Sequence, residues 1–187
     1  AVISECREKF TEKITETTAS MGVVIAHHKQ SLLQVLAELQ KAVKLAKEGL
    51  EGKNGFCVSL MKRSGGTSHC LAHWEYKGLK VLPILTELIH CYQENKISDR
   101  WYYQFENEKL GLLLGGTTGD SNTINLYLAQ LELKRLILRH ADMRKIKSGE
   151  LNQLLEKLEK LMAEIGLWDQ FTGLMQIAIY IARGGGR

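Results

Sequence analysis

The segment 121–147 has the pattern of an amphipathic helix with two apolar faces instead of one. With about 100° of rotation per residue, one face carries Ile124, Tyr127, Leu128, Leu131 and Leu138. The opposite face carries Leu126, Leu133, Leu136 and Ile137. A helix at the edge of a protein needs only one apolar stripe, so two stripes predict packing from both sides. We therefore expect this helix to lie in the middle of a helical bundle.

The first fifty residues have a second helical pattern, with apolar residues at alternating steps of three and four. The first part of this stripe consists of Ile3, Cys6, Phe10, Ile14, Thr17 and Met21. Gly22 interrupts it, because a glycine costs about 1 kcal/mol in the interior of a helix. The pattern predicts either one long N-terminal helix or a pair of helices over 2–20 and 23–51.

The remaining apolar patterns predict further helices that are separated by glycine-containing turns. The expected helices cover 69–95, a segment that follows Ser98 and ends at Gly115–Gly116, then 150–166, and finally 167–183, which should be buried. Pro83 should kink or divide the first of these, because proline removes a backbone hydrogen bond of the helix. The pattern leaves the type of the short apolar segment 56–61 open.

Together these patterns predict an all-α fold, a single bundle of about six or seven helices with a long N-terminal helix or helix pair. The chain contains one proline and no sustained alternation of the strand type, which supports this fold class. We expect one domain over 1–183, in which 1–21 could protrude or pack separately. A flexible tail over 184–187 should follow it.

Composition narrows the class of protein. Hydrophobic residues make up 44% and charged residues 25% of the chain, as in ordinary globular proteins, which argues against disorder. No apolar run approaches the roughly 20 residues of a membrane-spanning helix. The chain has four cysteines and no secretory signal, so we expect reduced thiols and a cytoplasmic location, although a start at Ala1 is also compatible with a processed or partial chain.

Arg135 and His140 form an Arg-x4-His pattern in a basic helix. This pattern resembles that of the ribonucleases in the helical HEPN superfamily. The resemblance implies that Arg135 would hold an RNA phosphate and that His140 would act as general acid or base, across a dimer interface. The alternative is structural, with an exposed Arg135 and a partly buried His140. An RNA-cleaving enzyme is therefore the least favoured of three functions.

A group of metal-ligating residue types lies between positions 57 and 91. Its members are Cys57, His69, Cys70, His73, His90 and Cys91. A zinc site needs three or four such side chains that converge, but no Cys-x-x-Cys pair is present. Free cysteines are often small buried hydrophobic residues. We therefore predict no metal and no other cofactor.

The end of the central helix is basic and could bind anions. The cations of this patch are Lys134, Arg135, Arg139, Arg144, Lys145 and Lys147. They could contact nucleic acid or an anionic membrane. Cations are also common at the negative end of a helix dipole, and the net charge of the chain is only +4.

The preferred function is a non-enzymatic protein-interaction domain: an adaptor, a scaffold or an oligomerisation unit that binds another protein or a second copy of itself. Heptad-like apolar stripes are the geometry of helix–helix packing, and part of the N-terminal stripe lacks an evident internal partner. The interface residues that we predict are Ile3, Phe10, Ile14, Met21, Trp101 and Tyr102. Binding of nucleic acid or an anionic membrane through the basic patch is the alternative.

Overall fold

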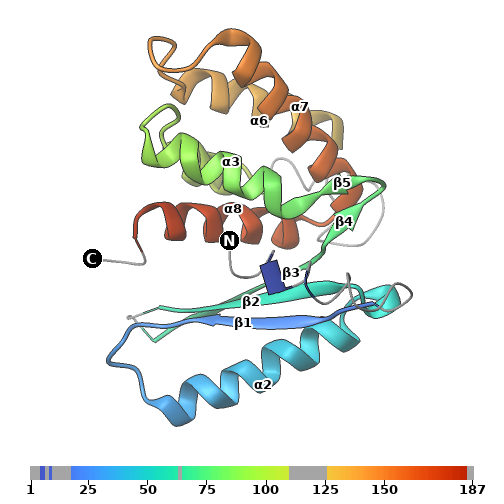
Figure 1. Ribbon diagram of the computed structural model, residues 1–187. Coiled ribbons are helices and arrows are strands. Elements are labelled where there is room, and N and C mark those ends of the chain that lie inside the picture. Colours follow the sequence, from blue (N-terminus) through green and yellow to red (C-terminus); the bar gives the residue numbers. More distant parts are fainter. Residues whose placement is uncertain (1–4, 7–8, 10–17, 63–64, 110–125, 185–187) are drawn as a thin grey trace. The chain divides into compact units, whose positions relative to one another are not determined.

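The computed structural model describes residues 5–6, 9, 18–62, 65–109 and 126–184, in two compact units, 1–75 and 76–187. These described residues form six α-helices, a three-stranded mixed sheet and a two-stranded sheet (Figure 1). The prediction of an all-α fold is therefore wrong, and the chain is a mixture of α and β structure. We describe each unit by itself.

The first unit is built on a three-stranded sheet. Its strands are β1 (Met21–Ile25), β2 (Gly55–Met61) and β3 (Thr67–His73), in the order β1-β2-β3. β1 runs parallel to β2 and is connected to it by the helix α2 (Leu32–Glu48) and the short 3-10 turn η1 (Glu51–Lys53). β2 and β3 are antiparallel neighbours. Figure 1 shows α2 lying along one face of this sheet.

The strands β1 and β2 replace parts of the expected helices for identifiable reasons. Val23, Val24 and Ile25 are β-branched and favour a strand, and the helix expected over 23–51 begins only at Leu32. Six of the seven residues of β2 are buried, on both faces of the strand. A strand that is buried on both faces has no alternation of apolar and polar residues, so its periodicity does not distinguish it from a helix.

Small residues allow α2 to approach the sheet closely. Ala42 and Ala46 are fully buried against Cys57. A Cβ atom added at Gly22 would lie 2.6 Å from the backbone nitrogen of Val43 and 2.7 Å from its Cγ2. Gly22 is therefore required by the contact between β1 and α2, and it does not mark a break within one long helix.

In place of the helix expected over 69–95, the chain forms the end of β3, then a hairpin and a shorter helix. The elements are β4 (Glu75–Tyr76), β5 (Leu79–Lys80) and α3 (Val81–Gln93). Lys77 and Gly78 connect the two strands with φ angles of 45° and 85°, as a two-residue type I′ turn requires. Pro83 lies in the first turn of α3, where a missing backbone N–H breaks no helical hydrogen bond.

The second unit is helical. After α3 it contains α4 (Arg100–Asn107), α6 (Leu126–His140), α7 (Ser148–Ile165) and α8 (Trp168–Ala182). α3 packs on α7 and α8, and α6 packs on α4 and α7. The ring of Phe105 stacks on that of Trp168, with centroids 4.6 Å apart, in the core. The helices predicted over 150–166 and 167–183 are confirmed, and α8 is buried along most of its length.

We predict that Gly22→Ala destabilises the protein by about 1–3 kcal/mol, because overpacking forces backbone and side-chain shifts. Urea denaturation, followed by circular dichroism, measures this change. Gly66→Ala is the matched control, since nothing lies within 4 Å of a Cβ at that position. Equal stability of the two variants would contradict the close contact between β1 and α2.

Candidate functional site

The helix α6 has one buried and one exposed apolar face. Ala129, Leu133, Leu136 and Ile137 are buried in the second unit. On the opposite face, Tyr127 is 70% exposed, Leu131 50% and Leu138 41%. Leu126 and Leu128 are also exposed. The described residues therefore pack α6 from one side only, so our prediction of packing from both sides is wrong; Ile124 lies outside the described residues.

The exposed face has the spacing of a helix–helix seam. Tyr127, Leu131, Lys134 and Leu138 follow one another at steps of four, three and four, and all four are exposed. Apolar residues at this spacing align along one side of a helix and fit the grooves of a second helix. A lysine among them resembles the polar core positions that fix the register of a coiled coil. We call these four residues the α6 seam.

The six predicted basic residues are all exposed, but they belong to two elements. Lys134, Arg135 and Arg139 lie on α6, beside or within the α6 seam. Arg144, Lys145 and Lys147 lie in the turn between α6 and α7, so they do not extend α6 as expected.

Two of these cations have acidic partners. The Arg135 guanidinium donates to Glu132, with Nε 2.7 Å from Oε2, and the Arg144 guanidinium donates to Asp142, with Nε 3.2 Å from Oδ1. These ion pairs reduce the positive potential of the patch.

Arg135 and His140 do not meet within one chain. Five residues along a helix place them about 140° apart, and Arg135 is held by Glu132. His140 Nε2 donates to Gln104 Oε1 at 3.1 Å. Burial, together with the charges of Arg139 and Arg100, lowers the pKa of His140 from its usual 6.5. The imidazole of His140 is therefore neutral near pH 7. Within the described residues, Arg135, the other member of the Arg-x4-His pattern, does not lie beside it to hold a phosphate.

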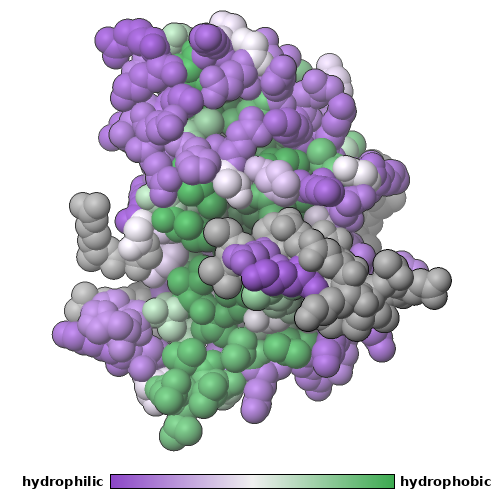
Figure 2. Space-filling view, in the orientation of Figure 1, coloured by the Kyte–Doolittle hydropathy of each residue, from purple (hydrophilic) through white to green (hydrophobic). Residues whose placement is uncertain are grey.

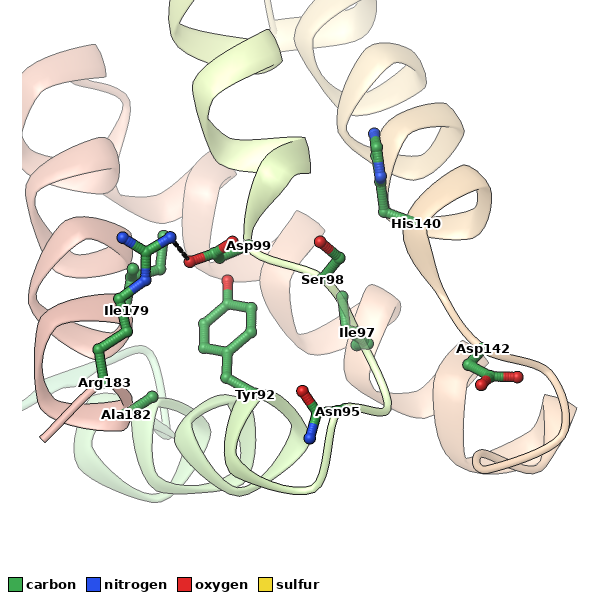
Figure 3. A pocket seen from close by; sticks show the side chains of 10 residues that line it. All are labelled: Tyr92, Asn95, Ile97, Ser98, Asp99, His140, Asp142, Ile179, Ala182 and Arg183. Atoms are coloured by element: carbon green, nitrogen blue, oxygen red, sulfur yellow. Dashed lines mark ion pairs between the residues drawn. The ribbon is translucent and has the colours of Figure 1, made fainter.

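His140 does border a pocket of about 370 Å³ at the end of α6 (Figure 3). Two backbone hydrogen bonds build one wall: Ser98 N donates to His140 O at 2.9 Å, and Asp142 N donates to Lys96 O at 2.8 Å. They join the segment between α3 and α4 to the end of α6.

The charged groups of this pocket are already paired. Arg183 forms an ion pair with Asp99, drawn as a dashed line in Figure 3, and Asp142 pairs with Arg144. The Tyr92 hydroxyl accepts a hydrogen bond from Trp101 Nε1 at 2.9 Å. With its charges neutralised internally, the pocket offers little electrostatic preference for a charged ligand.

The candidate zinc ligands do not converge. No group of three or more His, Cys, Asp or Glu side chains among the described residues could hold a metal ion. In the first unit, Cys57 pairs with Leu71 and Cys70 pairs with Val58, so the two cysteines lie on opposite faces of the sheet. Burial raises the pKa of the Cys57 and Cys91 thiols to about 11, which keeps both protonated.

Three of the predicted interface residues, Ile3, Phe10 and Ile14, lie outside the described residues. Met21 is half-buried in β1. Trp101 and Tyr102 are buried in the second unit, and Trp101 is completely so. Trp101 and Tyr102 therefore belong to the hydrophobic core and present little surface to a partner.

A pair formed by the buried Glu38 and the partly exposed His69 in the first unit was not anticipated from the sequence. Glu38 of α2 accepts a hydrogen bond from His69 Nε2 of β3 at 2.6 Å, and its side chain is only 8% exposed. Ser59 lies beside His69 in the register of β2 and β3. The signal in the sequence for a buried polar contact was Glu38 itself, a glutamate on the otherwise apolar side of α2, four residues before Ala42.

Neighbouring groups stabilise the ionised form of Glu38 in its buried position. Burial raises the pKa of Glu38, but the hydrogen bond from His69 and the nearby positive charges outweigh it, and the pKa falls below its usual 4.5. The pair thus connects α2 to β3.

No helix in the described part of the chain has the length and apolar character to cross a membrane. Comparison with known proteins finds no family model that matches the chain and no curated protein that is significantly similar to it.

We predict that Glu38→Gln destabilises the protein by about 1 kcal/mol at pH 7, because a charged hydrogen bond is replaced by a neutral one. The folded pKa of Glu38 lies below the unfolded value, so its stabilisation is complete above pH 4.5 and is lost as the pH falls through the folded pKa. The difference between wild type and variant should therefore shrink towards pH 3. Urea denaturation at pH 7, 4.5 and 3 measures it.

Glu48→Gln on the same helix is the control. Its carboxylate is exposed and lies 3.8 Å from Lys44, so little change is expected at any pH. A Glu38→Gln variant as stable as Glu48→Gln at pH 7 would show that the Glu38–His69 pair does not hold α2 on the sheet.

Proposed function

We propose that this chain is a non-enzymatic protein-interaction module and that the α6 seam is its docking surface. The observation that carries the proposal is the exposure of a second, regularly spaced apolar face on a helix whose first face is buried at Leu133, Leu136 and Ile137. Single exposed apolar side chains are ordinary on protein surfaces, but a contiguous row of them is typical of a binding surface. The free state of all four cysteines supports a cytoplasmic location for such a module.

The partner that suits this surface is an amphipathic helix. The steps of four, three and four place the members of the α6 seam in one row, which a second helix can cover along its length. Burying the exposed side chains of Tyr127, Leu131 and Leu138 would contribute roughly 1 kcal/mol each. A loop or a flat surface would cover this row less completely than a helix.

The charges around the seam indicate an acidic partner. Lys134 lies within the seam, Arg139 lies beside it, and neither has an ion pair among the described residues. Acidic side chains flanking the apolar face of the partner would complement both cations and select the orientation of the helices. Such rim charges mainly affect association rate and specificity, while the apolar row supplies affinity.

The basic patch also supports the alternative, which is binding to nucleic acid or an anionic membrane. Four of its six cations, Lys134, Arg139, Lys145 and Lys147, have no described acidic partner. However, leucines occupy the same face, and no exposed aromatic row for base stacking accompanies the cations in the turn after α6. The enzyme hypothesis has less support, because Glu132 already holds the Arg135 guanidinium that would bind the phosphate.

We predict that the double variant Leu131→Gln, Leu138→Gln loses its partner while keeping its fold. Replacing two apolar side chains of the seam should weaken binding by about tenfold or more. The measurement is a pull-down from the source lysate after nuclease treatment, followed by titration of the recovered protein against wild type and variant. Met143→Gln is the control, because Met143 is 52% exposed but lies outside α6.

Loss of one protein band with the double variant, and its retention with Met143→Gln, would support the proposal. Recovery of nucleic acid, with affinity that falls steeply between about 50 and 200 mM salt, would favour the basic patch instead. Equal binding by wild type and the double variant would refute the α6 seam as the docking surface.

A further inference from the structure

Among the described residues of the first unit, nothing pairs with the outer edge of β1. The strand order β1-β2-β3 places β1 at the border of the three-stranded sheet, with β2 on its inner side. No backbone group of Met21–Ile25 forms a hydrogen bond beyond the β1–β2 ladder within the described residues. The outer edge of such a strand presents alternating N–H and C=O groups that only another extended backbone can satisfy together.

This edge lacks the features that normally prevent strand addition. Proteins protect exposed edges with charged residues, proline or bulges. β1 has the sequence MGVVI, with no charge and no proline, and it pairs with β2 over all five residues without a bulge. An incoming strand would therefore meet neither electrostatic nor steric opposition from the side chains of β1.

A row of exposed leucines lies along the same side of α2. Val43 packs against Gly22 and so marks the side of α2 that faces β1, whereas Glu38 reaches His69 and marks the side towards β3. At about 100° per residue, Leu32 and Leu36 fall on the Val43 side. Leu32 is 70% and Leu36 is 46% exposed. Figure 2 shows the apolar patch at the corresponding end of α2.

We propose that the outer edge of β1 and the leucine row of α2 form a second docking site, which binds an extended, uncharged segment of another polypeptide. The segment would add a fourth strand beside β1. Every second side chain of an added strand points to the same face of the sheet. Apolar side chains at those positions would cover Leu32 and Leu36, and β-branched residues would suit the strand conformation.

Two features of this site define the polypeptide segment that it would bind. The unpaired backbone edge requires an extended chain, because a helix satisfies its own backbone groups. The absence of charge in Met21–Ile25, together with two exposed leucines, requires apolar side chains on the face towards α2. This site is independent of the α6 seam, which belongs to the other unit and suits an acidic helix.

The experiment uses the whole chain and a fluorescent, uncharged peptide, acetyl-QTVTVTVQ-amide, in which valines occupy one face of a strand. Anisotropy measures affinity, and backbone NMR measures which amides are affected. We expect saturable binding, with chemical-shift changes over Val23, Val24 and Ile25 and slower hydrogen exchange at those of their amides that point to the outer edge of β1. We expect no binding of the same peptide with its valine and threonine amides N-methylated, because it cannot form the ladder.

Matched variants test the leucine row. Leu32→Gln with Leu36→Gln should weaken peptide binding by about tenfold. Leu45→Gln is the control, because Leu45 is 39% exposed on the side of α2 towards β3, and it should change affinity by less than about twofold. All three positions are exposed, so the fold should persist.

Several results would overturn this proposal. They are the absence of saturable binding, equal binding of the N-methylated peptide, or an effect of Leu45→Gln as large as that of the double variant. Perturbation of α6 amides in place of β1 amides would assign the peptide to the other surface. A dimer of the chain that forms through β1 and excludes the peptide would replace the proposed occupant with a second copy.

Discussion

The packing of α6 by one face is the constraint on which the functional account depends. Leu133, Leu136 and Ile137 are buried in the second unit and fix the rotation of the helix about its axis. Because the side chains of a helix follow one another at a constant angle, that rotation also fixes the direction of Tyr127, Leu131 and Leu138. The core of the second unit thereby presents a straight apolar row on its surface. The proposed docking surface is a consequence of how the core packs.

The first unit depends on an equally simple contact, the close approach of α2 to the sheet. Gly22 and Ala42 remove side-chain volume where β1 meets the helix, and the Glu38–His69 hydrogen bond holds the other side of α2 against β3. With both sides fixed, α2 has a defined rotation, and Leu32 and Leu36 are directed along the β1 side. In each unit, then, a well-packed helix carries apolar side chains on an uncovered face.

The sequence pattern predicted the positions of the last two helices, α7 and α8, well. α7 and α8 were predicted nearly to their ends, because leucines at heptad spacing and an almost wholly apolar segment have few other solutions in a bundle. On α6, the apolar face with Leu133, Leu136 and Ile137 is buried, whereas Leu126, which was predicted on the same face, is exposed. The pattern could not show that the face with Tyr127, Leu131 and Leu138 is exposed, because burial depends on elements distant in the chain.

The strands were missed for physical reasons that differ between them. β2 is buried on both faces and therefore lacks alternation, while β1 is so short that Met21 and Ile25 also fit a helical spacing. The Lys77–Gly78 turn was the clearest local signal for β structure, and the nearby Pro83 was interpreted as a kink instead of a helix start. The position of Glu38 on the apolar side of α2 was a signal, but its partner His69 could not be predicted, because it lies 31 positions away in the chain.

The central claim is that another protein covers the α6 seam. It is tested most directly by placing a photo-reactive amino acid at position 131 and, in a second variant, at position 143, and by irradiating source cells that express either variant. The account predicts a cross-link to one protein from position 131, through an acidic amphipathic helix, and no such cross-link from position 143. Cross-links from position 131 to nucleic acid or lipid alone, or the same protein from both positions, would contradict it.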